Sequence, residues 1–331
     1  MIPYRKAFSA VSILAAGTML AAFTSGDAWC ADSYPTKPVR ILVGFSAGGA
    51  NDLVARAVGS RLGPRLRQQV VVENRPGAGG NIATELASRA APDGYTLLLA
   101  SVASFAMSPA LLGKVPFDPI NDFAPVTQAV VVTSLLSVHP NVPVKSVEEF
   151  VALVKRRPGG LNYATPGTGS IAHLSSELFK LRAGIRLNHI PYKGGNPAVT
   201  DVIAGHVESI FSLISTQVPH VRAGKLRGLG VTSAKRVAAL RQIPTIAESG
   251  YPGFEASGWL GFVFPAKTPG TVVDRMQREI VAVLNMPEVR SQLENVGLDP
   301  EPTNPASFDA LIRADHVRWA KVVKDAGIRL K

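Results

Sequence analysis

Residues 39–62 read VRILVGFSAGGANDLVARAVGSRL, an apolar run that breaks into small residues and then resumes. Apolar side chains recur at helical spacing from Leu53 to Leu62, so the stretch predicts a strand, a small-residue loop and the start of a helix. The unpaired amides and positive dipole end of such a helix can hold an anion without a charged side chain. The alternative is an ordinary tight connection in which Asp52 stabilises the first helical turn.

A second loop with the same design spans residues 163–170 and precedes an amphipathic helix over 171–181. One interpretation is anion capture by its amides and by the hydroxyls of Thr168 and Ser170; the other is helix capping by Ser170. His173, just inside this helix, either contacts a ligand or is structural. Together the two loops favour a grip on one acidic ligand.

The first thirty residues have the composition of an export signal. Arg5 and Lys6 precede an apolar stretch over 7–23, and small or polar residues follow, so we expect a signal peptide over 1–30 and a periplasmic mature protein. The stretch is shorter than the roughly 20 residues that span a bilayer. Cys30 is the only cysteine, so the chain beyond it has no disulfide or thiolate metal site; lipid anchoring at Cys30 is an alternative.

The composition favours a globular protein with an acidic small-molecule ligand. The chain has 331 residues, 46% of them hydrophobic, which predicts two lobes, and its formal net charge is +11. Nucleic-acid binding is the usual inference from such a charge. Export and the lack of a clustered basic patch with interleaved aromatics exclude that class here.

Alternating strand and helix patterns predict an α/β fold with parallel pairing. Ligands of such sheets bind outside the carboxyl ends of the strands, where both loops fall. Ser101 and Ser104 also follow a strand and either line the cleft or cap a turn. We expect the chain to pass between lobes near 140–143 and 250–253. The expected strands are 39–45, 69–73, 95–100, 130–138, 161–164, 187–190, 209–213, 226–231 and 258–264, and the expected helices are 53–62, 82–89, 146–156, one after Pro197, 273–283 and 308–322.

Other local patterns do not indicate catalysis. Residues 77–82 lack the third glycine of a dinucleotide fingerprint and are interpreted as a turn. There is no G-x-S-x-G elbow, no H-E-x-x-H and no metal-ligand spacing among the six histidines, so we expect no cofactor and no metal. Lys193 either forms an ion pair or is a hydrated loop lysine, and Trp259 either stacks on a ligand or belongs to the core.

Motifs along nearly the whole mature chain carry a family resemblance. In their order and combination they resemble the Bug family of extracytoplasmic solute receptors, which serve tripartite tricarboxylate transporters. The matching segments are Tyr34-Pro35-x-Lys37-Pro38-Val39-Arg40, Phe45-x-x-Gly48-Gly49-x-x-Asp52-x-x-Ala55-Arg56, 72–80, 92–96, 117–125, Gly167-x-Gly169-Ser170-x-x-His173-Leu174, 192–194, 205–207 and 252–255.

The resemblance implies a two-lobed periplasmic binding protein fold with a central cleft that closes on a ligand. Lobe 1 would comprise 34–138 and 258–331, and lobe 2 would comprise 139–257. The family's ligands are mainly carboxylates, held by backbone amides and ordered water. Carried onto this chain, the binding residues are Phe45, Ser46, Ala47, Gly48, Asn51 and Asp52 from one loop, and Gly167, Thr168, Gly169, Ser170 and His173 from the other.

The expected function is therefore that of a monomeric periplasmic receptor that delivers a small organic acid to membrane transporter subunits. Asp52 would select among acids by accepting a hydrogen bond from a ligand hydroxyl, amino group or bridging water. The alternatives are an exported hydrolase that uses His173 with Ser170 or Asp52, and a sensory receptor for the same class of ligand.

Overall fold

A loop of small residues joins the first strand to the first helix, as the sequence predicts. The computed structural model describes residues 34–157 and 159–328, so the expected signal peptide lies outside the described residues. β1 (Val39–Val43) leads through this loop to α1 (Ala50–Leu66). α1 extends beyond the predicted end at 62. Gly63 and Pro64 normally indicate a break, but the helix continues through both.

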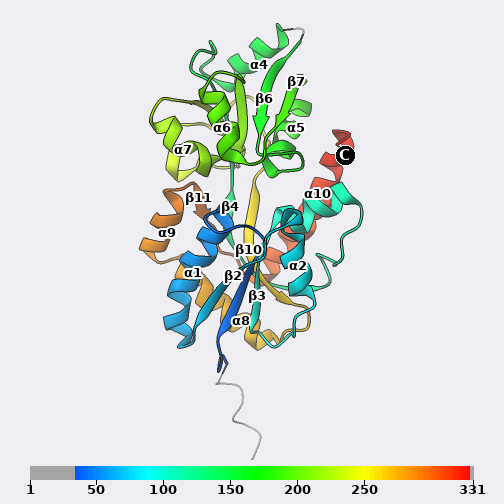
Figure 1. Ribbon diagram of the computed structural model, residues 1–331, viewed down its shortest axis with the longest axis vertical. Coiled ribbons are helices and arrows are strands. Elements are labelled where there is room, and N and C mark those ends of the chain that lie inside the picture. Colours follow the sequence, from blue (N-terminus) through cyan, green and yellow to red (C-terminus); the bar gives the residue numbers. More distant parts are fainter. Residues whose placement is uncertain (1–33, 158, 329–331) are drawn as a thin grey trace, which may run out of the picture. The chain divides into compact units, whose positions relative to one another are not determined.

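Six strands form the first sheet, in the order β11-β4-β10-β3-β1-β2 (Figure 1). β1 pairs in parallel with β2 and β3, as expected, whereas β10 is antiparallel to both β3 and β4. The sheet is therefore mixed. Its other strands are β2 (Val70–Asn74), β3 (Thr96–Ser101), β4 (Phe123–Val132), β10 (Gly258–Pro265) and β11 (Leu298–Pro300).

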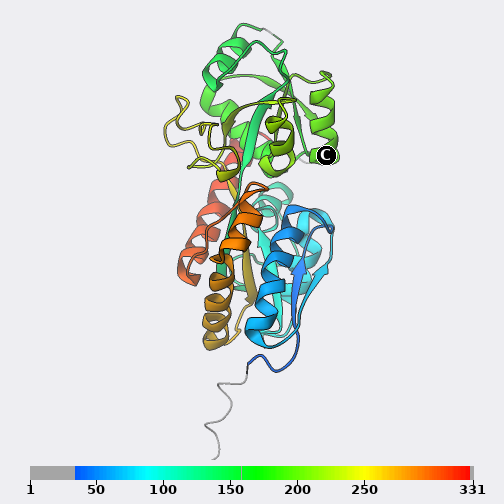
Figure 2. The same cartoon turned by 90° about the vertical axis from the view of Figure 1, so that its left-hand side faces the viewer.

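Helices from both ends of the chain pack beside this sheet. α8 and α10 contact β4, and α1 contacts α8, so the C-terminal segment returns to the first sheet (Figure 2). The sequence indicated two C-terminal helices, but a third, short helix lies between them. The helices are α2 (Asn81–Ser88), α3 (Ser108–Leu112), α8 (Gly270–Leu284), α9 (Pro287–Glu294) and α10 (Pro305–Asp325), with helical turns at Ala78–Gly80 and Ala103–Met107.

Five strands form the second sheet, in the order β7-β6-β8-β5-β9. β6 pairs in parallel with β7 and β8, and β5 is antiparallel to β8 and β9. The strands are β5 (Ser134–Val138), β6 (Leu161–Thr165), β7 (Leu187–Pro191), β8 (Ser209–Leu213) and β9 (Arg227–Val231), and the helices are α4 (Val147–Lys155), α5 (Ile171–Ala183), α6 (Gly195–Ile203) and α7 (Ile214–Arg222), with a turn at Ala238–Leu240.

The apolar run over 130–138 is divided between the two sheets and is not the single strand expected. Thr133 separates β4 from β5, and the carbonyl oxygen of Thr133 accepts from the N–H of Ile214 at 3.0 Å. Periodicity cannot reveal this change, because both halves of the run are buried strands. The chain therefore first passes between the sheets before residues 140–143. Residues 134–138 pair within the second sheet, whereas the sequence placed them in lobe 1.

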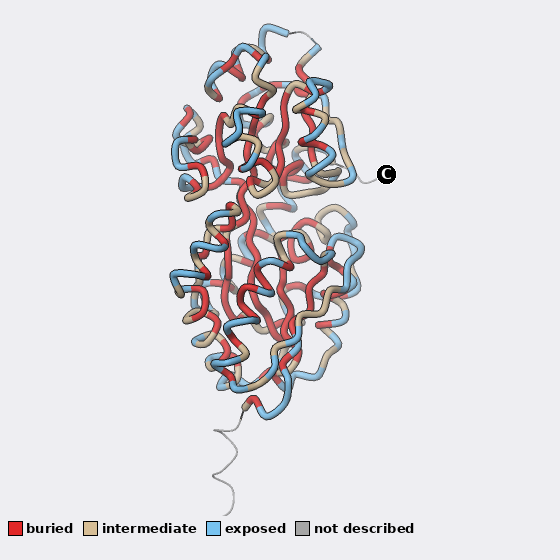
Figure 3. Tube along the Cα trace, turned by 60° about the vertical axis from the view of Figure 1, so that its left-hand side comes forward, coloured by how far each residue is buried: buried red, intermediate tan, exposed pale blue. Residues whose placement is uncertain are grey.

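The strand β10 lies between β4 and β3 in the first sheet, and all its residues are buried. Figure 3 shows that buried residues concentrate in the inner strands, with exposed residues around them. Trp259 is 2% exposed, lies edge-on to Phe308 with ring centroids 5.0 Å apart, and donates from Nε1 to Asp315 Oδ2 at 3.0 Å. At its start, a Cβ atom on Gly258 would lie 2.7 Å from Cγ1 of Val102 and 3.5 Å from Cγ1 of Ile171. Gly258 therefore lets side chains from the two halves of the fold meet.

We expect Gly258→Ala to lower the free energy of unfolding by about 1–3 kcal/mol, because the added methyl group would overlap Val102 and force its side chain to shift. Urea unfolding followed by circular dichroism measures the change. Gly270→Ala is the control, since a Cβ atom at that first residue of α8 meets nothing within 4 Å. Equal stability of the two variants would contradict the packing role of Gly258.

Candidate ligand-binding cavity

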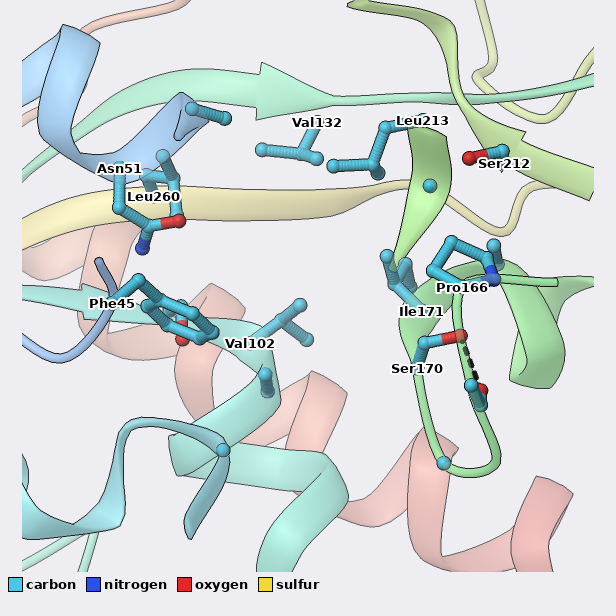
Figure 4. Close-up of a pocket in the computed structure, with 18 of the residues that line it drawn as sticks. Phe45, Asn51, Val102, Val132, Pro166, Ser170, Ile171, Ser212, Leu213 and Leu260 are labelled. Atoms are coloured by element: carbon cyan, nitrogen blue, oxygen red, sulfur yellow. Dashed lines mark hydrogen bonds between the residues drawn. The ribbon is translucent and has the colours of Figure 1, made fainter. Parts of the chain in front are cut away.

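A cavity of about 390 Å³ lies between loops that come from both sheets (Figure 4). Its size falls within the range of small-molecule sites. The walls are built from the carboxyl ends of strands and the first residues of helices. The lining residues are Phe45, Ala50, Asn51, Gly79, Ser101, Val102, Ala103, Ser108, Val132, Pro166, Gly167, Thr168, Gly169, Ser170, Ile171, Ala172, Gly195, Ser212, Leu213, Thr216, Trp259 and Leu260.

Several helices of the described chain begin at this cavity. The first residues of α1, α5 and α6 line it directly, and α7 begins next to the lining residue Leu213. None of the residues that line the cavity in the described chain is Asp, Glu, Lys, Arg or His. The local field therefore comes from the main chain: the first N–H groups of a helix and its dipole favour a negative charge there.

The first loop contributes its two ends to the cavity. Phe45 and Asn51 line it as expected, but Ser46, Ala47 and Gly48 are not among the lining residues. Asn51 lies beside Phe45 and Leu260 (Figure 4). Its side-chain Nδ2 is buried and has no hydrogen-bond partner in the described structure. An amide donor left in this way is a candidate contact for a ligand oxygen.

Asp52 is used inside the first loop and is not among the residues lining the cavity. Its carboxylate accepts from Gly48 N at 2.9 Å, from Arg56 Nε at 2.9 and 3.0 Å, and from Asn74 Nδ2 at 2.9 Å. Burial alone would raise the pKa of Asp52, but the hydrogen bonds from Arg56, Gly48 and Asn74 outweigh it and lower the pKa. The carboxylate thus has protein partners where the sequence interpretation expected a ligand group.

The second loop presents residues 166–171 to the cavity, including the predicted Gly167, Thr168, Gly169 and Ser170. Ser170 caps α5: its Oγ accepts from His173 N at 3.2 Å and donates to Gly167 O at 2.8 Å. Gly167 and Gly169 have φ angles of 147° and 79°, which favour glycine. Both interpretations of this segment are compatible, since Ser170 caps the helix and also lines the cavity.

His173 stands behind this loop and does not line the cavity. Its Nδ1 accepts from Gly169 N at 3.1 Å, and its ring stacks on His189 with centroids 4.1 Å apart. Burial lowers the pKa of His173, so the ring is neutral and can accept this bond. His173 is the third residue of α5 and Asp52 the third of α1, and each accepts the N–H four residues earlier, so the two loops are braced in the same way.

His189 extends the brace behind the second loop, although it lies on β7. His189 Nε2 is 2.7 Å from Thr165 Oγ1, which accepts from Gly167 N at 3.3 Å. Burial lowers the pKa of His189 to about 4, and the adjacent His173 adds to this effect. On the far side of the rings, Glu177 accepts from Tyr163 Oη at 2.6 Å and from Lys180 Nζ at 2.7 Å. This cluster combines residues from separate strands and helices, so no local spacing indicates it.

These contacts give no nucleophile and base of a hydrolase. The Ser170 hydroxyl donates to a carbonyl and accepts from the His173 backbone, not from its ring. Nε2 of His173 faces Glu177 Oε1 at 3.6 Å, and Asp52 is held by its own loop. Among the described residues, no group of three His, Cys, Asp or Glu side chains is placed to hold a metal ion.

The remaining predicted residues have separate roles. Ser101 lines the cavity at the end of β3, whereas Ser104 is buried in the following turn and donates to Ser101 O at 3.3 Å. Trp259 borders the cavity with an indole that belongs to the core. The sequence interpretation missed several lining residues from strand ends and from the loop at 192–197, in which it considered an ion pair for Lys193 against a hydrated surface lysine. The missed lining residues include Val132, Gly195, Ser212, Leu213, Thr216 and Leu260.

The sequence matches a known family over most of its length. A family profile described as "Tripartite tricarboxylate transporter family receptor" matches residues 54–328. Protein BugT of Bordetella pertussis is 37% identical over 302 residues, which cover 91% of this chain and 93% of BugT.

Solved structures with the same two-lobed α/β fold are also similar to it. One is an R. palustris protein solved with adipate, 35% identical with a TM-score of 0.79, where the match covers 89% of this chain and 99% of the other. Another is MatC from Rhodopseudomonas palustris with bound malate, 30% identical with a TM-score of 0.74, covering 88% and 100% of the two chains.

Replacing the brace of the first loop tests its role. We expect Asp52→Asn to lower the free energy of unfolding at pH 7 by about 1–3 kcal/mol, because one amide oxygen cannot serve Gly48, Asn74 and Arg56 together. The lowered pKa means that the carboxylate stabilises the fold above the unfolded pKa of about 3.9 and that this contribution is lost in stronger acid. Urea titration at pH 7 and pH 3 measures both effects.

Asp309→Asn is the matched control for this substitution. Asp309 pairs with Arg313 four residues later at 2.7 Å, but its side chain is 37% exposed, and we expect a change below about 0.5 kcal/mol. Equal losses in the two variants would show that Asp52 is an ordinary surface ion pair.

Acid should weaken the fold through the paired histidines. Their folded pKa values lie below the unfolded value near 6.5, so the unfolded chain binds more protons as the pH falls from about 6.5 toward 4, and stability declines over that window. We expect His189→Gln to reduce the total loss of unfolding free energy between pH 6.5 and pH 4 by on the order of 2 kcal/mol. Thermal unfolding at half-unit pH steps measures the slope.

His206→Gln is the control for the acid response. The His206 side chain is 70% exposed, so we expect the slope of the parent protein. A slope unchanged by His189→Gln would exclude His189 as the source of acid sensitivity.

Proposed function

Because the chain belongs to the tripartite tricarboxylate transporter receptor family, we propose that it is a periplasmic receptor that binds a small organic acid and delivers it to membrane transporter subunits. The observation that carries this proposal is the cavity at which α1, α5, α6 and α7 begin and whose lining, within the described chain, has no charged residue. Main-chain donors bind an anion without a strong ion pair that would slow release, and water can adapt them to related acids.

The ligand class is supported by similar proteins. Structures 35% and 30% identical to this chain were solved with adipate and malate, both of which are carboxylates. We assign the direct ligand contacts to Phe45, Asn51, Ser101 and the loop 167–170, which line the cavity. Residues 46–48, Asp52, Ser104 and His173 then act indirectly, by holding these groups in place.

The two sheets provide the two bodies that such a receptor needs. We assign 37–133 with 258–328 to one lobe and the described part of 134–257 to the other, following the strand pairing. Closure would bring the loops that precede α1 and α5 onto opposite ends of one ligand. Export by a signal peptide over 1–30 and action as a monomer complete the proposal. Among the described helices, none is long and apolar enough to cross a bilayer.

The side chain of Asn51 tests the assignment of the cavity. We expect Asn51→Ala to weaken binding of the natural acid about tenfold or more, because a donor to a charged oxygen contributes about 1.5–3 kcal/mol. The acid is first identified by native mass spectrometry of the purified protein, and its affinity is then measured by calorimetry. Recovery of the acid unchanged after long incubation distinguishes a receptor from a hydrolase.

Asn285→Ala serves as the control, since Asn285 is exposed at the end of α8, and we expect its affinity to equal that of the parent protein. Release of a chemically altered acid, or binding that Asn51→Ala leaves untouched, would contradict the receptor function or this cavity as its site.

A further inference from the structure

The middle of the cavity is made of hydrocarbon side chains. Val102, Val132, Ile171, Leu213 and Leu260 line it: Val102 directly follows β3, and the other four lie in β4, α5, β8 and β10. In Figure 4 Val102, Ile171 and Leu213 lie between Asn51 on one side and Ser212 and Pro166 on the other. The middle of a ligand that spans these loops therefore lies against an apolar cavity wall.

The aromatic wall at one end is held in a fixed position. The backbones of Gly44 and Gly80 meet so closely that a Cβ atom on Gly44 would lie 2.7 Å from Gly80 Cα. A Cβ atom on Gly80 would in turn lie 3.2 Å from the Phe45 ring. The turn at 78–80 thus seats Phe45, which lines the cavity. Because this wall is already held in place, a ligand that packs against it does not lose binding free energy to ordering of the Phe45 side chain.

Along the wall formed by Ser170, Ser212 and Thr216, the hydroxyl groups have their protons committed to the protein. Thr216 Oγ1 donates to Leu213 O at 2.8 Å, so the contact between Ser212 Oγ and Thr216 Oγ1 at 3.1 Å uses the Ser212 proton. Ser170 Oγ donates to Gly167 O at 2.8 Å. An added hydroxyl on a ligand would therefore lose water and gain few donors.

Charge is compensated only where helices begin. The described lining has no cationic side chain, so a compact acid with several charges would place some of them against hydrocarbon. A carboxylate at a helix start avoids this cost, because the N–H groups there accept negative charge. The arrangement suits charge at the ends of a ligand and hydrocarbon between.

Resting on the proposed function, the geometry points to a ligand class: carboxylates with an unsubstituted aliphatic or aromatic body. Hydroxylated acids and compact polycarboxylates bind more weakly, because of the apolar walls and the committed hydroxyl groups of Ser170, Ser212 and Thr216. The walls, and not the anion-binding loops, set this preference.

Calorimetric titration of the purified protein with matched acids tests the inference. From butanoate to hexanoate we expect affinity to rise about fourfold for each methylene transferred into the cavity. We expect succinate to bind at least fivefold more tightly than malate, which differs from it by one hydroxyl group, and adipate to bind more tightly than citrate.

Two near-isosteric substitutions connect the preference to the walls. Val132→Thr and Leu213→Asn each make a wall polar, and we expect hexanoate to bind at least fivefold more weakly while succinate changes less than twofold. Val317→Thr is the matched control, because Val317 is 71% exposed on α10 and should leave all affinities unchanged. Circular dichroism spectra and melting curves confirm that each variant is folded.

The outcomes separate this inference from the proposed function. If malate or citrate binds more tightly than the apolar acids, the ligand class is wrong while carboxylate binding stands. Equal losses for hexanoate and succinate in the wall variants would also overturn it. If no carboxylate binds the folded protein, the proposed function itself fails, and this inference fails with it.

Discussion

Backbone N–H groups can recognise an anion only if the loops that carry them keep one conformation. In this protein the constraint is met twice by the same device. The third residue of a helix reaches back to the N–H just before the cap, through Asp52 to Gly48 in the first loop and through His173 to Gly169 in the second. The acceptors differ, one an ionised carboxylate and the other a neutral ring, but each fixes its loop from behind. The cavity side is left to small residues and main-chain groups.

This arrangement explains why Asp52 and His173 do not line the cavity and why Ser170, which does, has its hydroxyl group engaged. Histidine, aspartate and serine all occur near it, and each is engaged in holding a loop or capping a helix. Behind the second loop the ring stack of His173 on His189 is buried, which keeps both rings uncharged near neutral pH. A receptor needs this kind of rigidity, because the described lining contributes no charged side chain to anchor an anion.

The sequence predicted the two loops and the α/β class because both depend on local patterns: an apolar run, small residues and helical spacing. It could not show that the run over 130–138 changes sheet at Thr133, since both halves are equally apolar. It assigned Asp52 and His173 to the ligand because they lie in the right segments, and only geometry reveals that they point into the loops. Leu213, Val132 and Gly195 were missed because they reach the cavity from strands and a helix far apart in the chain.

A site built from main-chain groups has an evolutionary consequence. Every residue type except proline carries the same N–H donor, so replacement at loop positions other than Gly48, Gly167 and Gly169, whose positive φ angles favour glycine, seldom removes the capacity to hold a carboxylate. The side chains that line the cavity between the loops, by contrast, can be substituted one at a time without loss of these main-chain donors. Related receptors can therefore change their ligand specificity through substitutions at a few wall positions while they keep the same main-chain groups that bind the carboxylate.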